Sequence, residues 1–237
     1  MPRSLTLAIE TSNPGHGAAA SVTGALLADA DSSVLGIAPL APASRHDDAL
    51  MPAIEGLCRT CDATPAMIDR VVVSIGPGGY TSIRIAVTTA KMIATATGAS
   101  CVGVPTALAV AMQHWTDDQD ARPRTVYLAW KRGDVYRTHY ASRADLTDTT
   151  AGEITPIDAL RLEPGSIVLA DSAFLDVIRD QGDLPSDVCL EEAVLHPEAV
   201  LHAAAACATT DPLSLLPLYP REPEAVSKWK TRPGASG

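Results

Sequence analysis

Residues 71–98, VVVSIGPGGYTSIRIAVTTAKMIATATG, join an apolar strand to a helix through a glycine-rich turn. The residues before the turn are mostly β-branched and apolar, which is typical of a buried strand. Small and apolar residues with a helical period follow the turn. A strand that leads directly into a helix is the repeating unit of an α/β sheet, so this stretch predicts that fold class.

The turn in this stretch follows neither of the common phosphate-binding motifs. A P-loop ends in Gly-Lys-Ser/Thr, and the dinucleotide-binding signature needs a third glycine where Thr81 stands. The glycines are instead expected to permit a sharp corner, with Thr81 or Ser82 capping the helix. The alternative is an anion site at the helix N-terminus with Arg84 nearby. The residues assigned to the structural turn and helix start are Gly76, Gly78, Gly79, Thr81 and Arg84.

Similar patterns divide the rest of the chain into strands and helices. Expected strands cover residues 4–10, 17–22, 25–30, 70–75, 101–104 and 166–170, with a hairpin over 125–140. Expected helices cover residues 46–61, 82–97, 105–115, 171–181 and 197–208. The polar residues 141–165 and the proline-rich residues 209–237 are expected to be partly disordered. Strands that alternate with helices after leading hairpins predict an α/β fold with a mixed sheet.

The order of the first elements is three strands, a helix, a strand and a helix. This order is similar to the subdomain unit of the actin and Hsp70-like ATPases, which use the unit twice. The second copy here looks reduced. The predicted units are an N-terminal actin-like subdomain at residues 1–100, a C-terminal actin-like subdomain at 101–215 and a tail at 216–237.

Composition and charge disfavour direct nucleic-acid binding, secretion and membrane insertion. The formal net charge is -10, so the surface repels nucleic acid, and any contact with RNA is expected to pass through a partner. Five cysteines, an odd number, favour free thiols in a reducing compartment. No apolar run is long enough for a signal peptide or a bilayer span, so we predict a cytoplasmic protein with no membrane partner.

Two further motifs carry weak chemical signals. Glu10-Thr11-Ser12 follows the first strand, where actin-like ATPases place a phosphate-binding turn, but no lysine accompanies it. An ordinary hairpin is therefore favoured over a weak nucleotide contact. Cys58 and Cys61 lie at a helix end on an apolar face, which favours core packing over zinc or redox chemistry.

The six histidines lack metal-binding spacing, so no catalytic residue, cofactor or metal is predicted.

The helix at 82–97 has two apolar sides. One side, suited to the sheet beneath it, carries Ile83, Ala86, Val87, Ala90, Ile93 and Ala94. Ile85, Met92 and Ala96 cluster on a second side, which a lone surface helix does not need. We predict that this helix and the helix at 46–61 dock on a like pair of a second subunit. The predicted interface comprises Met51, Ile54, Cys58, Ile85, Ala86, Thr89, Met92 and Ala96.

Six segments, spread in order over the whole chain, carry a family resemblance. They are LAIETS at 7–12, SRHDDALMPAIEGL at 44–57, VSIGPGGYTSIRIAVTTA at 73–90, VGVPTALAVA at 102–111, KRGDVYRTHY at 131–140 and LPLYPREPEAVSKW at 216–229. The chain resembles the TsaB (YeaZ) family, the non-catalytic partner subunit of the bacterial machinery that attaches threonylcarbamoyl to the adenosine next to the tRNA anticodon. It departs from the family pattern at Glu10, Ser82, Ala86 and Pro220.

The resemblance implies an actin/Hsp70-like (ASKHA, ribonuclease H-like) fold and a scaffold or activator role without catalysis. It also implies docking on a catalytic paralogue (TsaD-like), contact with an ATPase (TsaE-like), self-dimerisation when alone, and tRNA contact only through the complex. Ser82 and Ala86 stand where the family usually has glycine, which disfavours a close approach to phosphate. The alternative is an enzyme of the same superfamily, either a glycopeptidase or a sugar-kinase-like ATPase.

Overall fold

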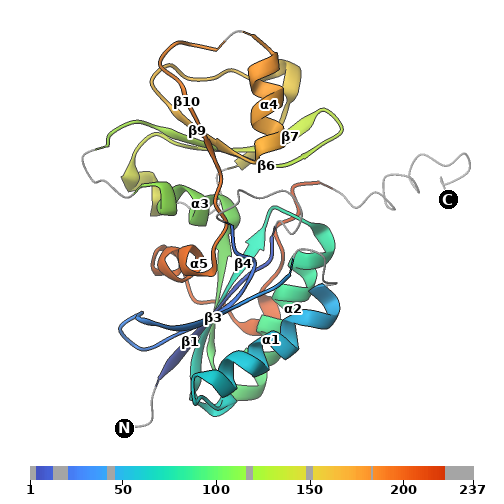
Figure 1. Cartoon of the computed structure of the whole chain (residues 1–237), viewed down its shortest axis with the longest axis vertical. Helices are drawn as coiled ribbons and strands as arrows, with labels where there is room; N and C mark the ends of the chain where they lie inside the picture. Colours follow the sequence, from blue (N-terminus) through green and yellow to red (C-terminus); the bar gives the residue numbers. More distant parts are fainter. Residues whose placement is uncertain are drawn as a thin grey trace, which may run out of the picture.

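The computed structural model describes residues 4–12, 21–41, 46–115, 120–147, 152–182 and 184–221, with the backbone alone at 46–48 (Figure 1). The strands are β1 Leu5–Glu10, β2 Gly24–Ala28, β3 Val34–Pro39, β4 Ile68–Gly76, β5 Ser100–Pro105, β6 Arg124–Lys131, β7 Asp134–Tyr140, β8 Gly152–Pro156, β9 Ile167–Ala170 and β10 Cys189–Glu192. The helices are α1 His46–Thr60, α2 Tyr80–Thr97, α3 Thr106–His114, α4 Ser172–Asp180 and α5 Pro197–Ala203.

Two five-stranded sheets share one strand arrangement. Sheet A has the order β3-β2-β1-β4-β5, and sheet B has the equivalent order β8-β7-β6-β9-β10. In each sheet an antiparallel three-strand meander is joined by two parallel strands. In sheet A, α1 connects β3 to β4, whereas the short helical turn Ile157–Ala159 connects β8 to β9 in sheet B. The chain therefore has the predicted actin/Hsp70-like α/β fold with a reduced second copy.

Apolar side chains form three layers, because alternate residues of a strand point to opposite faces of its sheet. Leu7 and Val71 face the layer shared with α1 and α2, whereas Ala8 and Val72 face the layer shared with α3 and α5. The layer of α3 and α5 continues onto one face of sheet B, so these helices lie between the sheets (Figure 1). On the other face of sheet B, α4 packs through Phe174.

Several predicted elements needed correction. The third strand of the first meander is β3, whereas the predicted strand at 17–22 falls largely outside the described residues and is not a strand at 21–22. β8 lies in a segment expected to be partly disordered, and β10 lies where no element was predicted. Both strands are short, and none of their residues is fully buried, so their hydrophobic pattern is weak. The helix predicted at 197–208 ends at Ala203 and continues as a short helical turn.

The sheets divide the chain differently from the boundary predicted at residue 100. β5 pairs with β4 in sheet A, and α5 contacts β1, β2 and β4 although it lies near the end of the chain. Thr210, in a segment expected to be partly disordered, forms a β-bridge with Cys101 of β5. Sheet B is therefore built from residues 124–192. Periodicity identifies an element, but long-range pairing decides which sheet the element joins.

Candidate functional site

The turn between β4 and α2 begins the candidate site. Gly76 has a φ of 105°, a region that favours glycine, and its peptide bond to Pro77 is cis. The N-cap of α2 is Gly79, which makes no side-chain cap. The helix starts at Tyr80, two residues earlier than the predicted start at residue 82. The predicted cap was wrong: Thr81 lies exposed in the first turn of the helix, and the Ser82 hydroxyl donates to the carbonyl of Gly79 at 2.9 Å.

The turn after β4 and the segment after β1 are in direct contact. The amide of Gly79 donates to the carbonyl oxygen of Ser12 at 2.6 Å. Gly78 lies against the same carbonyl, so closely that a Cβ atom there would overlap it. The backbone groups that would form an anion cradle at the start of α2 are therefore partly occupied by protein.

Glu10 lies at the end of β1 and is fully buried. Its Oε1 accepts hydrogen bonds from both the amide and the hydroxyl of Ser12, each at 2.5 Å, and its Oε2 has no partner in the described part of the chain. Burial raises the pKa of Glu10, although the hydrogen bonds from Ser12 oppose this effect. Thr11 donates to the carbonyl of Ser82 at 3.0 Å. Glu10-Thr11-Ser12 thus anchors β1 to α2, and the predicted hairpin turn after it lies outside the described residues.

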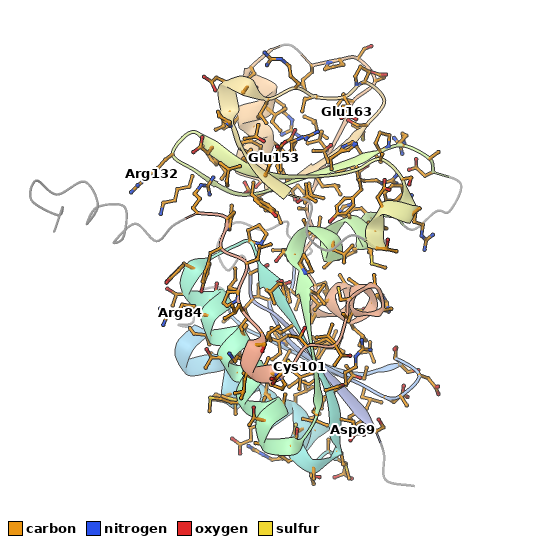
Figure 2. The ribbon with its side chains drawn as sticks, turned by 180° about the vertical axis from the view of Figure 1, so that it is seen from behind. Asp69, Arg84, Cys101, Arg132, Glu153 and Glu163 are labelled. Atoms are coloured by element: carbon orange, nitrogen blue, oxygen red, sulfur yellow. The ribbon has the colours of Figure 1, made fainter. Side chains whose placement is uncertain are left out.

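Arg84, the cation of the alternative anion site, stacks on an aromatic ring. Its guanidinium lies 5.5 Å from the centroid of the Tyr80 ring. Tyr80 in turn stacks on Tyr219, with ring centroids 4.7 Å apart. Figure 2 shows Arg84 at the outer side of α2. The sequence pattern did not indicate this stack, because Tyr219 lies far along the chain in a segment expected to form a tail.

The two sides predicted for α2 are only partly separate in the structure. The side toward the sheet is buried as predicted, at Ile83, Ala86, Val87, Ala90 and Ala94, with Ile93 half-buried. On the second side, Met92 is 65% exposed, Ala96 is exposed and Ile85 is half-buried. On the neighbouring α1, Met51 is 51% exposed. Met51, Ile85, Met92 and Ala96 can therefore meet a partner without rearrangement of the core.

Four residues of the predicted interface belong instead to the core. They are Ile54, Cys58, Ala86 and Thr89, and each is less than a tenth exposed. α1 and α2 contact each other as well as sheet A, and this contact covers side chains that a helix considered alone would present to solvent. The predicted interface is corrected accordingly. Residues that the sequence pattern missed are Tyr80, Leu213 and Leu216, which are exposed apolar side chains on α2 or on the segment that contacts it.

The other candidate chemical groups are structural. Cys58 is buried, which raises the pKa of its thiol, and Cys61 is half-buried against Gly36, as core packing predicts. Across the described ranges, no group of three or more His, Cys, Asp or Glu side chains could hold a metal ion. No helix in those ranges combines the length and apolar character needed to cross a membrane.

Comparison with known proteins places this geometry in a family. The model of the family described as "TsaD: tRNA N6-adenosine threonylcarbamoyltransferase" matches residues 26–162. The "tRNA threonylcarbamoyladenosine biosynthesis protein TsaB" of Bacillus subtilis (strain 168) is 45% identical over 49 residues, which cover 21% of this chain and 21% of that protein.

Two solved structures share the fold. The first is described as "an uncharacterized protein with similarity to peptidase YEAZ from Pseudomonas aeruginosa"; it has a TM-score of 0.72 and 18% identity over 92% of this chain and 100% of its own. The second is "YeaZ from Pseudomonas aeruginosa", with a TM-score of 0.69 and 16% identity over 91% of this chain and 99% of its own.

The two sheets have equivalent strand orders, and the two solved structures share this arrangement. The chain therefore has the two-subdomain fold of the actin/Hsp70-like class. Within that class, the family model covers more than half of the chain. The chain belongs to this TsaD-related family and is a member of its TsaB (YeaZ) type.

Proposed function

We propose that this chain is a non-catalytic scaffold or activator subunit of the complex that forms N6-threonylcarbamoyladenosine in tRNA, acting through a catalytic paralogue of the TsaD type. The family match and the TsaB-type relatives support the pathway. The observation that carries the non-catalytic role is the contact of Gly78 and Gly79 with the carbonyl of Ser12. This contact partly occupies the backbone groups at the start of α2 that a bound phosphate would need.

The docking face of this subunit is the exposed side of α1 and α2. Met51, Ile85, Met92 and Ala96 supply its apolar surface. α2 contains no aspartate or glutamate, although the net charge of the chain is -10. α2 therefore adds no negative charge to the face, which reduces the repulsion between two acidic subunits, and the exposed Glu55 of α1 is paired with Arg59. The occupant is a like helix pair of the paralogue, or of a second copy of this chain when the paralogue is absent.

The remaining partners follow from the same assignment. A TsaE-type ATPase joins the complex, and tRNA binds through the complex in the cytoplasm. An acidic surface cannot release counterions from phosphates, so this chain alone binds tRNA weakly at physiological salt. Tight binding of tRNA by the isolated chain in a gel-shift assay would contradict this arrangement.

Reconstitution tests the proposal. The TsaD-type paralogue and the ATPase are assayed for threonylcarbamoyl transfer to tRNA with and without this chain. Transfer is expected to depend on the chain, while the chain alone is expected to hydrolyse neither ATP nor peptides. Turnover by the repurified chain alone that disappears in Glu10→Ala would contradict the non-catalytic role. Transfer that proceeds equally well without the chain would contradict the activator role.

A further inference from the structure

Residues 210–221, which we call the strap, run along sheet A and then reach sheet B. The strap begins at the edge strand β5, where the amide of Thr210 donates to the carbonyl of Cys101 at 2.8 Å. It then passes α2, where Lys91 Nζ donates to the carbonyl of Leu213 at 3.0 Å. The strap therefore pairs with the edge strand β5 at one position before it passes α2.

The strap next packs on the turn between β4 and α2. The amide of Leu218 donates to the carbonyl of Ile75 at 2.8 Å, and the ring of Tyr219 stacks on Tyr80. A Cβ atom on Gly76 would lie 3.0 Å from the carbonyl oxygen of Leu218, so the close approach depends on glycine. Backbone hydrogen bonds, a lysine and an aromatic stack thus attach the strap to sheet A at several points.

Arg221 connects the strap to sheet B. Its Nη1 donates to the carbonyl of Ala129 in β6 at 2.6 Å. Ala129 has a φ of 53°, in the left-handed region, where the register of β6 and β7 shifts. The Nε and Nη2 atoms of Arg221 are buried without an acceptor in the described part of the chain. Burial lowers the pKa of this guanidinium, although Asp134 opposes the effect. Among the described residues, one hydrogen bond joins the strap to sheet B, whereas several join it to sheet A and α2, so the Arg221 end is the weaker one.

The strap and the inter-sheet helices lie on different sides of the molecule. α3 and α5 fill the core between the sheets, while the strap rises past the end of α2 toward the β6–β7 hairpin (Figure 1). Seen from behind, Arg84 of α2 and Arg132 of the hairpin lie along the same side (Figure 2). Two attachments at separate places oppose rotation of one sheet against the other.

We propose that the strap is a releasable latch between the two sheets. With Arg221 bound to Ala129, the latch holds sheet B at a fixed angle to sheet A and α2. When Arg221 is released, the strap stays on sheet A, because its other attachments are made there. This inference concerns the chain alone and does not depend on its partners.

Hydrogen–deuterium exchange on the full chain tests the latch. In Arg221→Ala, peptides that cover residues 124–140 and 217–221 are expected to exchange about tenfold faster, as the loss of one charged hydrogen bond allows. Peptides from α1 and α2 are expected to keep their protection. The matched control is Arg161→Ala. This substitution removes a hydrogen bond of 2.7 Å from Arg161 Nη1 to the carbonyl of Leu160, within the sheet B subdomain.

Three outcomes would overturn the latch. Exchange over 124–140 could stay unchanged in Arg221→Ala, it could rise equally in the Arg161→Ala control, or it could rise equally at the Thr210 end of the strap. If Arg221→Ala does not fold, Arg221→Gln keeps a polar side chain that ends two bonds short of Nη1, the atom that reaches the Ala129 carbonyl. The same local acceleration is then expected, and its absence counts against the proposal.

Discussion

Gly79 and Ser12 are joined by a hydrogen bond of 2.6 Å between the amide of the first and the carbonyl of the second. The bond ties the end of β1 to the start of α2, and Gly78 lies against the same carbonyl. The angle at which α2 leaves the sheet therefore depends on a backbone contact that admits no side chain. The turn therefore fixes the direction of α2, and the exposed side of this helix remains available to a partner.

Gly78→Ala tests the close contact between this turn and the carbonyl of Ser12. The added Cβ overlaps the carbonyl of Ser12, so the free energy of unfolding is expected to fall by about 1–3 kcal/mol. The control is Gly56→Ala in α1, where a Cβ meets no atom within 4 Å. Alanine is the better helix former, so this control is expected to gain about 0.5–1 kcal/mol. Urea denaturation measures both, and equal stability of the two variants would contradict the contact.

Glu10 is expected to make stability depend on pH. Burial raises its pKa in the folded state above its ordinary value of 4.5, so the neutral form is favoured by folding. Its contribution to stability is complete below pH 4.5 and is lost as the pH rises through the folded pKa. Glu10→Gln cannot ionise. The free energy of unfolding of this variant minus that of the parent is therefore expected to be larger at pH 8 than at pH 5. Urea denaturation at both pH values checks this, and an equal loss of stability at both would show that the native state needs the carboxylate.

Met51→Glu combined with Met92→Glu is expected to abolish association with the paralogue or a second copy. Burying each methionine contributes about 1.5–3 kcal/mol, and a buried unpaired carboxylate adds a further penalty. Both side chains are more than half exposed, so the variant is expected to remain folded. Size-exclusion chromatography and circular dichroism measure the two effects. Leu184→Glu, on an exposed leucine outside this face, serves as the control, and unchanged complexes in the double variant would refute the docking face.

Ala86→Leu separates the corrected core from the docking face. Ala86 is fully buried between α2 and the sheet, so the larger side chain is expected to destabilise the isolated chain by about 1–3 kcal/mol. Ala96→Leu, two turns or more along the same helix and exposed, is expected to leave the free energy of unfolding within about 0.5 kcal/mol. Thermal and urea unfolding of the two variants compare them directly. Equal stability would place Ala86 on the surface.

The sequence alone was sufficient for the features that depend on local periodicity. The apolar arc of α2 at Ile83, Val87 and Ala90 was predicted and is buried, because residues three to four apart share one face of a helix. β4 and the hairpin of β6 and β7 were predicted from a different local pattern, the apolar, β-branched and alternating residues that are typical of strands. The order of the elements, compared with the actin and Hsp70-like unit, predicted the repeated arrangement with a reduced second copy.

Tertiary structure decided which surfaces remain free. Thr89 and Ile54 were predicted to face a partner, but packing of α1, α2 and sheet A covers them. The strap was expected to be a partly disordered tail, yet Leu218 and Tyr219 pack on a turn about 140 residues earlier in the chain. Periodicity reports the preferred environment of a residue, whereas burial depends on neighbours brought in by long-range contacts that no local pattern encodes.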